Sequence, residues 1–389
     1  MSGVIQPTFI PNELQANLLR AALLSGDSGK QAWETWRSQS NLESLDYASF
    51  RLLPLVYSNQ SRLENTDHPE FARLKGTVRL TWSKNQLLLR SLQTTLGKLE
   101  QQGIEPVALK GSALLMGGYQ PIGGRPMHDL DILIKPDEVE AVKGCLEDLG
   151  WQAQSIRALL RKFRREQVFH NGQDQELDLH WHLLPEWCQP EHNDVIHQNT
   201  RKVNYGEQDI RILNPTFMLL HLIGHGYQWS PLPNMTWIAD CRQLLTAAEK
   251  QGTEHKIDWP LFLEWVQRFE ITSVTHQLFN FLDQELSAPI PKTTINSLQN
   301  LEPTKADLAA LDVRGEAPNT ARRVLKKHWL YYCSTQQSNG LSRNWFGFVR
   351  YFSLHFQDVW NLKFWWQTPF VALKRWLVDS RVKGLAELQ

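Results

Sequence analysis

The sequence predicts an α+β protein in which a small mixed sheet with helices is flanked by N- and C-terminal helical regions. Two observations predict this class. Apolar residues recur at helical spacing through the first hundred residues and again from about residue 214 to the end. Between these regions, short apolar runs and strictly alternating runs indicate strands. We therefore expect an N-terminal helical region (1–102), a central core (103–212) and a C-terminal helical region (213–389).

The flanking helices are predicted from apolar residues three and four positions apart. The N-terminal region has clear segments at 12–24 and 77–103, and Gly103 is suited to end the second of them. The C-terminal region has clear segments at 215–229, 235–250 and 259–269. A Pro- and Gly-containing stretch near 287–320 breaks the pattern, and we expect a loop or a subdomain junction there.

The first half of the central core is predicted as strand, short helix, loop and strand. EPVALK (105–110) is an apolar run of strand type, and a short helix begins at Gly111-Ser112. A Gly/Pro-rich loop, YQPIGGRPMH, leads into DLDILIK (129–135), which alternates as a strand does.

The second half is predicted as a helix and a β-hairpin. Residues 136–150 open with Pro136 and acidic residues and close with Gly150, which are start and stop signals of a helix. Residues 167–183 have the pattern of two strands around an Asn171-Gly172 turn.

Composition narrows the function classes. The 389 residues hold 41 basic and 41 acidic side chains, so no overall charge attracts nucleic acid, and such binding would need a local patch. The four cysteines form no C-x-x-C pair, which argues against a zinc knuckle or a disulfide framework. We see no signal peptide and no apolar run long enough for a transmembrane span. We therefore expect a cytoplasmic protein.

Three aspartates form the candidate metal site. Side chains of a strand alternate between faces, so Asp129 and Asp131 share one face while Leu130 and Ile132 point into the core. Asp178 alternates with leucines on the second strand of the hairpin and can add a third carboxylate. Carboxylates grouped in this way repel one another unless a cation neutralises them, and Mg²⁺ prefers carboxylates together with phosphate oxygens.

A candidate phosphate site precedes the aspartates. The Gly111-Ser112 pair lies between a predicted strand and a predicted helix, where free backbone N–H groups can bind phosphate. Lys110 and Arg125 are nearby cations that could offset triphosphate charge. For each cation a structural role is equally open: a solvated strand end for Lys110 and an ion pair with an adjacent aspartate for Arg125.

Taken together, LKGS, DLDILI and LDLHW resemble the minimal nucleotidyltransferase superfamily, which includes the palm of DNA polymerase beta. More closely, the chain resembles a bacterial family often labelled "NTP transferase 5". RLLPLVY (51–57), LLHLIGH (219–225) and WIADCRQLL (237–245) add to that likeness, which runs from about 15 to 250. The 17 residues between Gly111 and Asp129 exceed the spacing in many members of the superfamily.

The resemblance implies transfer of a nucleoside monophosphate from a nucleoside triphosphate, expected to be ATP, with release of pyrophosphate. Asp129, Asp131 and Asp178 would bind two Mg²⁺ ions, with Mn²⁺ as an alternative, and Gly111 and Ser112 would hold phosphates. Phosphate or glycosyl-phosphate transfer at the same site stays open, as does a non-catalytic nucleotide-binding protein. The acceptor could be a small molecule, a peptide, a protein or an RNA end.

Other chemistry-bearing residues have plainer interpretations. We expect His180 and His182 to support the carboxylates by hydrogen bonds, because Mg²⁺ disfavours imidazole. His221 and His225 are spaced to bind zinc on a helix, but no third ligand is evident, and we favour a buried histidine paired with Asp240.

Two further segments could contact ligands or partners. The basic run RKFRRE (161–166) is either a solvated helix face or a contact for an anionic substrate. The aromatic-rich segment 344–366 favours burial in the core, with a peripheral membrane or protein contact as the alternative.

Overall fold

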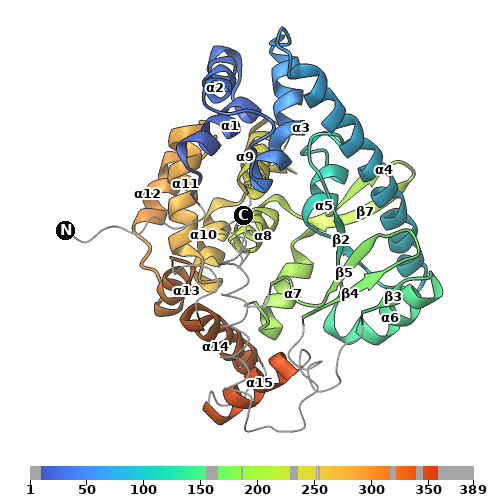
Figure 1. The fold of residues 1–389 in the computed structure, drawn as a ribbon. Helices are drawn as coiled ribbons and strands as arrows, with labels where there is room; N and C mark the ends of the chain where they lie inside the picture. The colour runs from blue at the N-terminus through green and yellow to red at the C-terminus, as the bar shows by residue number, and fades with distance from the viewer. Residues whose placement is uncertain are drawn as a thin grey trace.

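The computed structural model describes residues 10–154, 165–184, 187–227, 235–250, 252, 255–315, 321–338 and 345–357. A central sheet is surrounded by helices from both ends of the chain (Figure 1). The long helix α4 and helix α6 run along one side of the sheet, and the helices α8 to α12 lie on the other side. The predicted fold class is therefore confirmed.

The strands are β1 (Val107–Ala108), β2 (Asp129–Leu133), β3 (Gln152–Ala153), β4 (Glu166–His170), β5 (Glu176–His180), β6 (Thr200–Tyr205) and β7 (Gln208–Leu213). Within the described residues they form one seven-stranded sheet in the order β3-β4-β5-β2-β1-β7-β6. The β2–β5 and β1–β7 pairs are parallel and the other neighbours are antiparallel. The predicted hairpin is the β4–β5 pair, although its connection spans residues 171–175 rather than two residues.

The N-terminal helices are α1 (Glu13–Leu23), α2 (Gly26–Gln39), α3 (Tyr47–Arg62) and α4 (Phe71–Gln101). Local chemistry explains their ends. Asn12 and Gln15 form a capping box at α1, and the Asp46 carboxylate accepts from the Ser49 backbone N–H at the start of α3. Gly103 follows α4 with a φ of 79°, a left-handed conformation that favours glycine, as the sequence predicts.

The remaining helices are α5 (Lys110–Met116), the 3₁₀ turn η1 (Pro136–Glu138), α6 (Val139–Asp148), α7 (Pro190–Gln198), α8 (Pro215–Gly226), α9 (Thr236–Lys250), α10 (Trp259–Arg268), α11 (Thr272–Leu286), α12 (Lys292–Gln299), α13 (Lys305–Gly315), α14 (Ala321–Ser338) and α15 (Trp345–Gln357). The prediction of a loop near 287–320 is wrong for most of that stretch, because α12 and α13 form there. Ile295 and Leu298 of α12 are buried in the core, so packing fixes a helix too short to show a clear repeat.

One hydrophobic core joins all three regions. It includes Trp33 of the N-terminal helices, Leu130 and Ile132 of β2, and Phe217 and Phe279 of the C-terminal helices. Leu130 and Ile132 point to the face of the sheet against which α4 packs. Alternation along β2 therefore turns its aspartates toward the opposite face.

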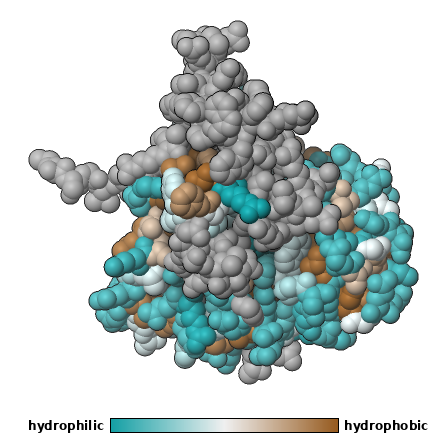
Figure 2. All heavy atoms as spheres, turned by 90° about the horizontal axis from the view of Figure 1, so that it is seen from below, coloured by the Kyte–Doolittle hydropathy of each residue, from teal (hydrophilic) through white to brown (hydrophobic). Residues whose placement is uncertain are grey.

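A second, smaller cluster lies in α14 and α15, where Tyr332 packs with Phe348 and Tyr351. The predicted burial of the aromatic segment 344–366 is thus confirmed for Phe348 and Tyr351, whereas Phe346 is 84% exposed and residues 358–366 lie outside the described chain. On the face shown in Figure 2, hydrophilic residues cover most of the described surface and hydrophobic residues form separate patches. No helix among the described residues is long and apolar enough to cross a membrane.

Candidate active site

The parallel pairing of β2 and β5 brings two of the predicted aspartates together. In the register of this pair, Asp131 lies directly opposite Asp178. Leu130 and Ile132 are fully buried on the other face, as the alternation predicts. Asp178 lies on β5, the second strand of the predicted hairpin, and the pairing of β5 with β2 brings it to Asp131.

Asp131 is the most enclosed of the three carboxylates, with 2% of its surface exposed. Lys110 Nζ lies 2.5 Å from its Oδ1, and His180 Nε2 lies 3.0 Å from the same oxygen. Burial alone would raise the pKa of Asp131, but the Lys110 and His180 contacts outweigh it and hold that pKa well below its usual range. The expected support of a carboxylate by His180 is thus confirmed.

Lys110 is fixed by the same cluster. Burial alone would lower the pKa of its ammonium group, but the charges of Asp131 and Asp129 raise that pKa above its usual range. Lys110 is therefore a fixed cation at the start of α5, not a solvated strand end, and its own φ of 48° places it in the left-handed region.

Asp178 differs from Asp131 because its charge is not compensated in the same way. Its Oδ1 atom is buried and has no hydrogen-bond partner within the described part of the chain. Burial and then the charge of Asp131 raise the pKa of Asp178 to about 7. One ligand atom from each of Asp131, Asp178 and His180 lies within 4.8 Å of the others, so these residues could hold a metal ion.

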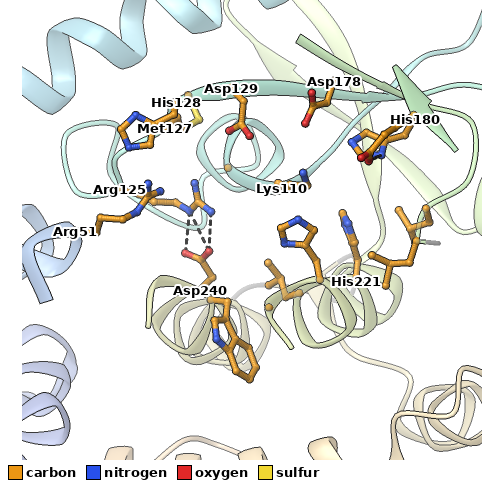
Figure 3. Close-up of a pocket in the computed structure, with 18 of the residues that line it drawn as sticks. Arg51, Lys110, Arg125, Met127, His128, Asp129, Asp178, His180, His221 and Asp240 are labelled. Carbon is orange, nitrogen blue, oxygen red and sulfur yellow. Dashed lines mark hydrogen bonds and ion pairs between the residues drawn. The ribbon is translucent and has the colours of Figure 1, made fainter. Parts of the chain in front are cut away.

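Asp129 is the third predicted carboxylate. It lines the same pocket as Asp178 and points into it beside Met127 and His128 (Figure 3). Its carboxylate does not belong to the close cluster formed by Asp131, Asp178 and His180. The structure therefore brings all three aspartates to one face, with Asp129 nearer to the loop that precedes β2.

The loop of residues 119–128 is held in place by Asn85 of α4. The buried Asn85 amide donates to the carbonyls of Ile122 and Arg125 at 2.6 and 2.8 Å and accepts from the Met127 N–H at 3.3 Å. These bonds fix the backbone on either side of Arg125.

Arg125 pairs with Asp240 of α9 instead of an adjacent aspartate. Its Nε lies 3.0 Å from both carboxylate oxygens and its Nη2 lies 2.9 Å from Oδ2, as the dashed lines in Figure 3 show. Gln120 also donates to Asp240. A Cβ on Gly111 would lie 2.1 Å from Arg125 Nη1, so glycine is required where the guanidinium crosses the start of α5.

Gly111 and Ser112 occupy different environments. Gly111 lines the pocket. Ser112 is buried, and its hydroxyl donates to the Leu109 carbonyl at 2.8 Å. A phosphate contact by the Ser112 hydroxyl stays a prediction, and would require it to leave that carbonyl.

Helix α8 carries His221 and His225, which both line the pocket, and Figure 3 shows His221 on the wall opposite the aspartates. His221 is 2% exposed, and its Nε2 atom has no hydrogen-bond partner among the described residues. Burial, then the charges of Lys110 and His180, lower the pKa of His221 to about 3, so the ring is neutral. The predicted pairing of these histidines with Asp240 is wrong, because the bonds to Asp240 among the described residues come from Arg125 and Gln120.

The remaining predicted residues lie at the edges of the site. His182 Nδ1 lies 3.0 Å from Asn193 Oδ1, and no carboxylate contacts it among the described residues. In the basic run, 161–164 lie outside the described chain, whereas the Arg165 guanidinium is buried over the Tyr331 ring at 5.3 Å.

These residues enclose a cavity of about 570 Å³. It is lined by Arg51, Lys110, Gly111, Arg125, Met127, His128, Asp129, Glu166, Asp178, His180, Leu183, Leu184, His221, Leu222, His225, Gly226, Trp237, Asp240, Lys327 and Tyr331. Arg51, His128, Lys327 and Tyr331 are lining residues that sequence reasoning missed. For Arg51 a signal was present, because it begins the RLLPLVY segment.

Comparison with family models matches residues 47–285 to a family described as an uncharacterised nucleotidyltransferase. The match covers α3 to α11 and therefore includes Asp129, Asp131, Asp178 and Asp240. Helix α14, which carries Lys327 and Tyr331, lies beyond it. No match was found among curated proteins.

Proposed function

The chain belongs to this nucleotidyltransferase family, and we propose that it transfers a nucleoside monophosphate from a nucleoside triphosphate, expected to be ATP, to an acceptor. In this reaction an acceptor oxygen bonds to the α-phosphorus, the bond between the α-phosphorus and the α,β-bridging oxygen breaks, and pyrophosphate leaves with that oxygen. The acceptor itself is left open by the proposal.

The observation that carries the proposal is the pairing of Asp131 with Asp178 on adjacent parallel strands, with Asp129 two residues away on the same strand. Carboxylates do not gather in a buried pocket without cations to offset their charge. Lys110 offsets Asp131. The buried Asp178 Oδ1 accepts no hydrogen bond from Lys110 or from any other described residue.

The donor set fits a divalent metal ion. Asp178 Oδ1 is a buried acceptor that no described residue satisfies, and the ligand atoms of Asp131 and His180 are close enough to share an ion with Asp178. We propose that Asp129, Asp131 and Asp178 hold Mg²⁺ ions, with His180 supporting Asp131. When bound, such ions stabilise the charge that develops on the phosphate oxygens and on the attacking oxygen.

The remaining roles follow from where the side chains lie. Arg125 is near Asp129, whereas Asp178 and His180 lie on the other side of Lys110 (Figure 3), and Gly111 is next to the Arg125 guanidinium. We therefore place the triphosphate beside Gly111, Lys110 and Arg125 and the acceptor beside Asp178. Arg125, fixed by Asp240, would neutralise phosphate charge with its Nη1, the amino group that does not bond to Asp240.

The test compares the wild-type protein with Asp178→Asn. Each α-labelled triphosphate is incubated with Mg²⁺ and a cell extract, and the labelled acceptor is identified by mass spectrometry. We expect wild-type protein to add the mass of a nucleoside monophosphate, and Asp178→Asn to lose the activity by at least about 100-fold. Asn has the same shape and removes a carboxylate whose burial already disfavours its charged form, so the fold should survive.

A matched control is Asp209→Asn, an exposed aspartate on β7 that does not line the pocket. It should transfer nucleotide at the wild-type rate. Full activity in Asp178→Asn would overturn the site assignment. If the acceptor gains the mass of a phosphate group alone, the site catalyses phosphoryl transfer, as a kinase does, instead of nucleotidyl transfer.

A further inference from the structure

Arg51 is a cation of the pocket to which the proposed function assigns no role. It belongs to α3, in the N-terminal helical region, and lines the pocket together with Arg125. Figure 3 shows the two side chains next to each other at the end of the pocket near His128 and Asp129. Two neighbouring guanidinium groups repel each other unless anions offset their charge.

Two other cations that line the pocket already have carboxylate partners. Lys110 pairs with Asp131, and Arg125 pairs with Asp240. Asp129 lines the same pocket, and the proposed function assigns it to a metal ion. Arg51 forms no ion pair with a carboxylate of the described chain.

The Arg51 guanidinium is nevertheless held in a fixed position. Its Nη2 donates to the Pro126 carbonyl at 3.0 Å, and its Nη1 donates to the Tyr47 hydroxyl at 3.0 Å. The Tyr47 hydroxyl in turn lies 3.3 Å from His128 Nε2. Both partners of Arg51 are neutral, so its positive charge is oriented but not offset.

The hydrogen-bonding capacity of Arg51 is also incomplete. Its Nε atom is buried and has no partner among the described residues. A guanidinium held by two neutral oxygens, with its Nε unpaired, is suited to bind an anion with several acceptor oxygens, and phosphate matches its geometry.

We propose that Arg51 binds the terminal phosphates of the nucleoside triphosphate and later the pyrophosphate that leaves. This inference rests on the proposed function. It places the phosphate tail along Arg125 and Arg51, away from the acceptor at Asp178. The N-terminal helical region would then form part of the nucleotide site through α3.

The test measures binding of inorganic tripolyphosphate, of the nucleoside triphosphate and of the nucleoside monophosphate, each with Mg²⁺, by calorimetry. Arg51→Met removes the charge and keeps most of the side-chain length. We expect it to weaken tripolyphosphate and triphosphate binding by about 10- to 100-fold, as loss of a charge-assisted hydrogen bond does, with monophosphate binding unchanged. Arg51→Lys should keep part of the affinity.

Two controls separate binding from folding. Arg62→Met makes the same substitution on the same helix outside the pocket and should bind like the wild type. Arg51→Gln keeps a donor for the Pro126 carbonyl without the charge. It should show the same loss as Arg51→Met, with an unchanged melting temperature, and it replaces Arg51→Met if that variant unfolds.

The outcomes distinguish this inference from the proposed reaction. Wild-type affinity for tripolyphosphate in both neutral variants, in a protein that transfers nucleotide, overturns the role of Arg51 alone. An equal loss of monophosphate binding also overturns it, because the guanidinium would then act nearer the α-phosphate. Binding of tripolyphosphate through Arg51 without nucleotide transfer by the wild type would overturn the proposed reaction and leave the anion site standing.

Discussion

At the scale of single residues, Asp178 Oδ1 and His221 Nε2 are two of the pocket's buried polar atoms that have no hydrogen-bond partner among the described residues. A buried polar group that makes no hydrogen bond destabilises the folded chain by about 1–3 kcal/mol. Both atoms belong to side chains that line the same cavity, on opposite walls. This loss of stability is consistent with polar groups whose hydrogen bonds or metal contacts a bound ligand supplies, because functional sites are often less stable than the rest of the fold.

This view predicts the effect of His221→Leu. Leucine has a similar volume and no polar atom. The free energy of unfolding of the variant should therefore be about 1–3 kcal/mol larger than that of the wild type. Urea denaturation without nucleotide measures the difference. His276→Leu is the control, because His276 of α11 lies 3.2 Å from the Asn280 amide nitrogen and outside the pocket. A loss of stability in His221→Leu would show that Nε2 has a partner in solution.

Sequence reasoning placed the residues of the central motif well. Strand alternation predicts that Asp129 and Asp131 face away from Leu130 and Ile132, and the predicted hairpin contains β5, whose pairing with β2 puts Asp178 opposite Asp131. The partners of Arg125 and Arg51 could not be predicted in this way. Asp240 is 115 residues from Arg125, and no local periodicity reports a contact at that separation.

At the scale of elements, α3 links the N-terminal region to the pocket because it carries Arg51. Its first turn is capped by Asp46, whose Oδ1 accepts from the Ser49 N–H at 2.8 Å and whose Oδ2 accepts from the Ser49 hydroxyl at 2.8 Å. Burial alone would raise the pKa of Asp46, but these bonds with Ser49 outweigh it and lower that pKa.

The cap predicts a pH dependence. A carboxylate whose pKa is lower in the folded chain stabilises it above the unfolded value, about 3.9, and this stability is lost as pH falls through the folded pKa. We therefore expect Asp46→Ala to be less stable than the wild type at pH 7, and the difference to shrink below pH 4. Urea denaturation of both proteins across this range measures it, and a difference independent of pH would contradict the cap.

Elements were predictable where their own sequence carries a strong pattern. The helices before residue 103, the strand β2 and the β4–β5 hairpin show such patterns. The sequence predicts a loop where the short helices α12 and α13 form. Burial against neighbouring helices stabilises these two helices more than their own apolar pattern does, so the pattern does not reveal them. The neighbours of each strand also depend on long-range pairing, so the order of the sheet does not follow from local patterns.

At the scale of the whole molecule, one cavity receives side chains from all three regions of the chain. α3 provides Arg51, the sheet provides the aspartates, and α8 and α9 provide His221 and Asp240. α14 adds Lys327 and Tyr331 from outside the segment that matches the family. The carboxylates lie within the matched segment, whereas Lys327 and Tyr331 do not.

The central claim is nucleotide transfer at the Asp129, Asp131 and Asp178 site, and paired labelling tests it most directly. The protein is incubated with its acceptor and Mg²⁺, using triphosphate labelled in the α-phosphate in one reaction and in the γ-phosphate in the other. We predict that the α label enters the acceptor and the γ label appears in pyrophosphate, and that both are lost with a chelator and in Asp178→Asn. Gamma label in the acceptor, or undiminished α transfer by Asp178→Asn, would contradict the claim.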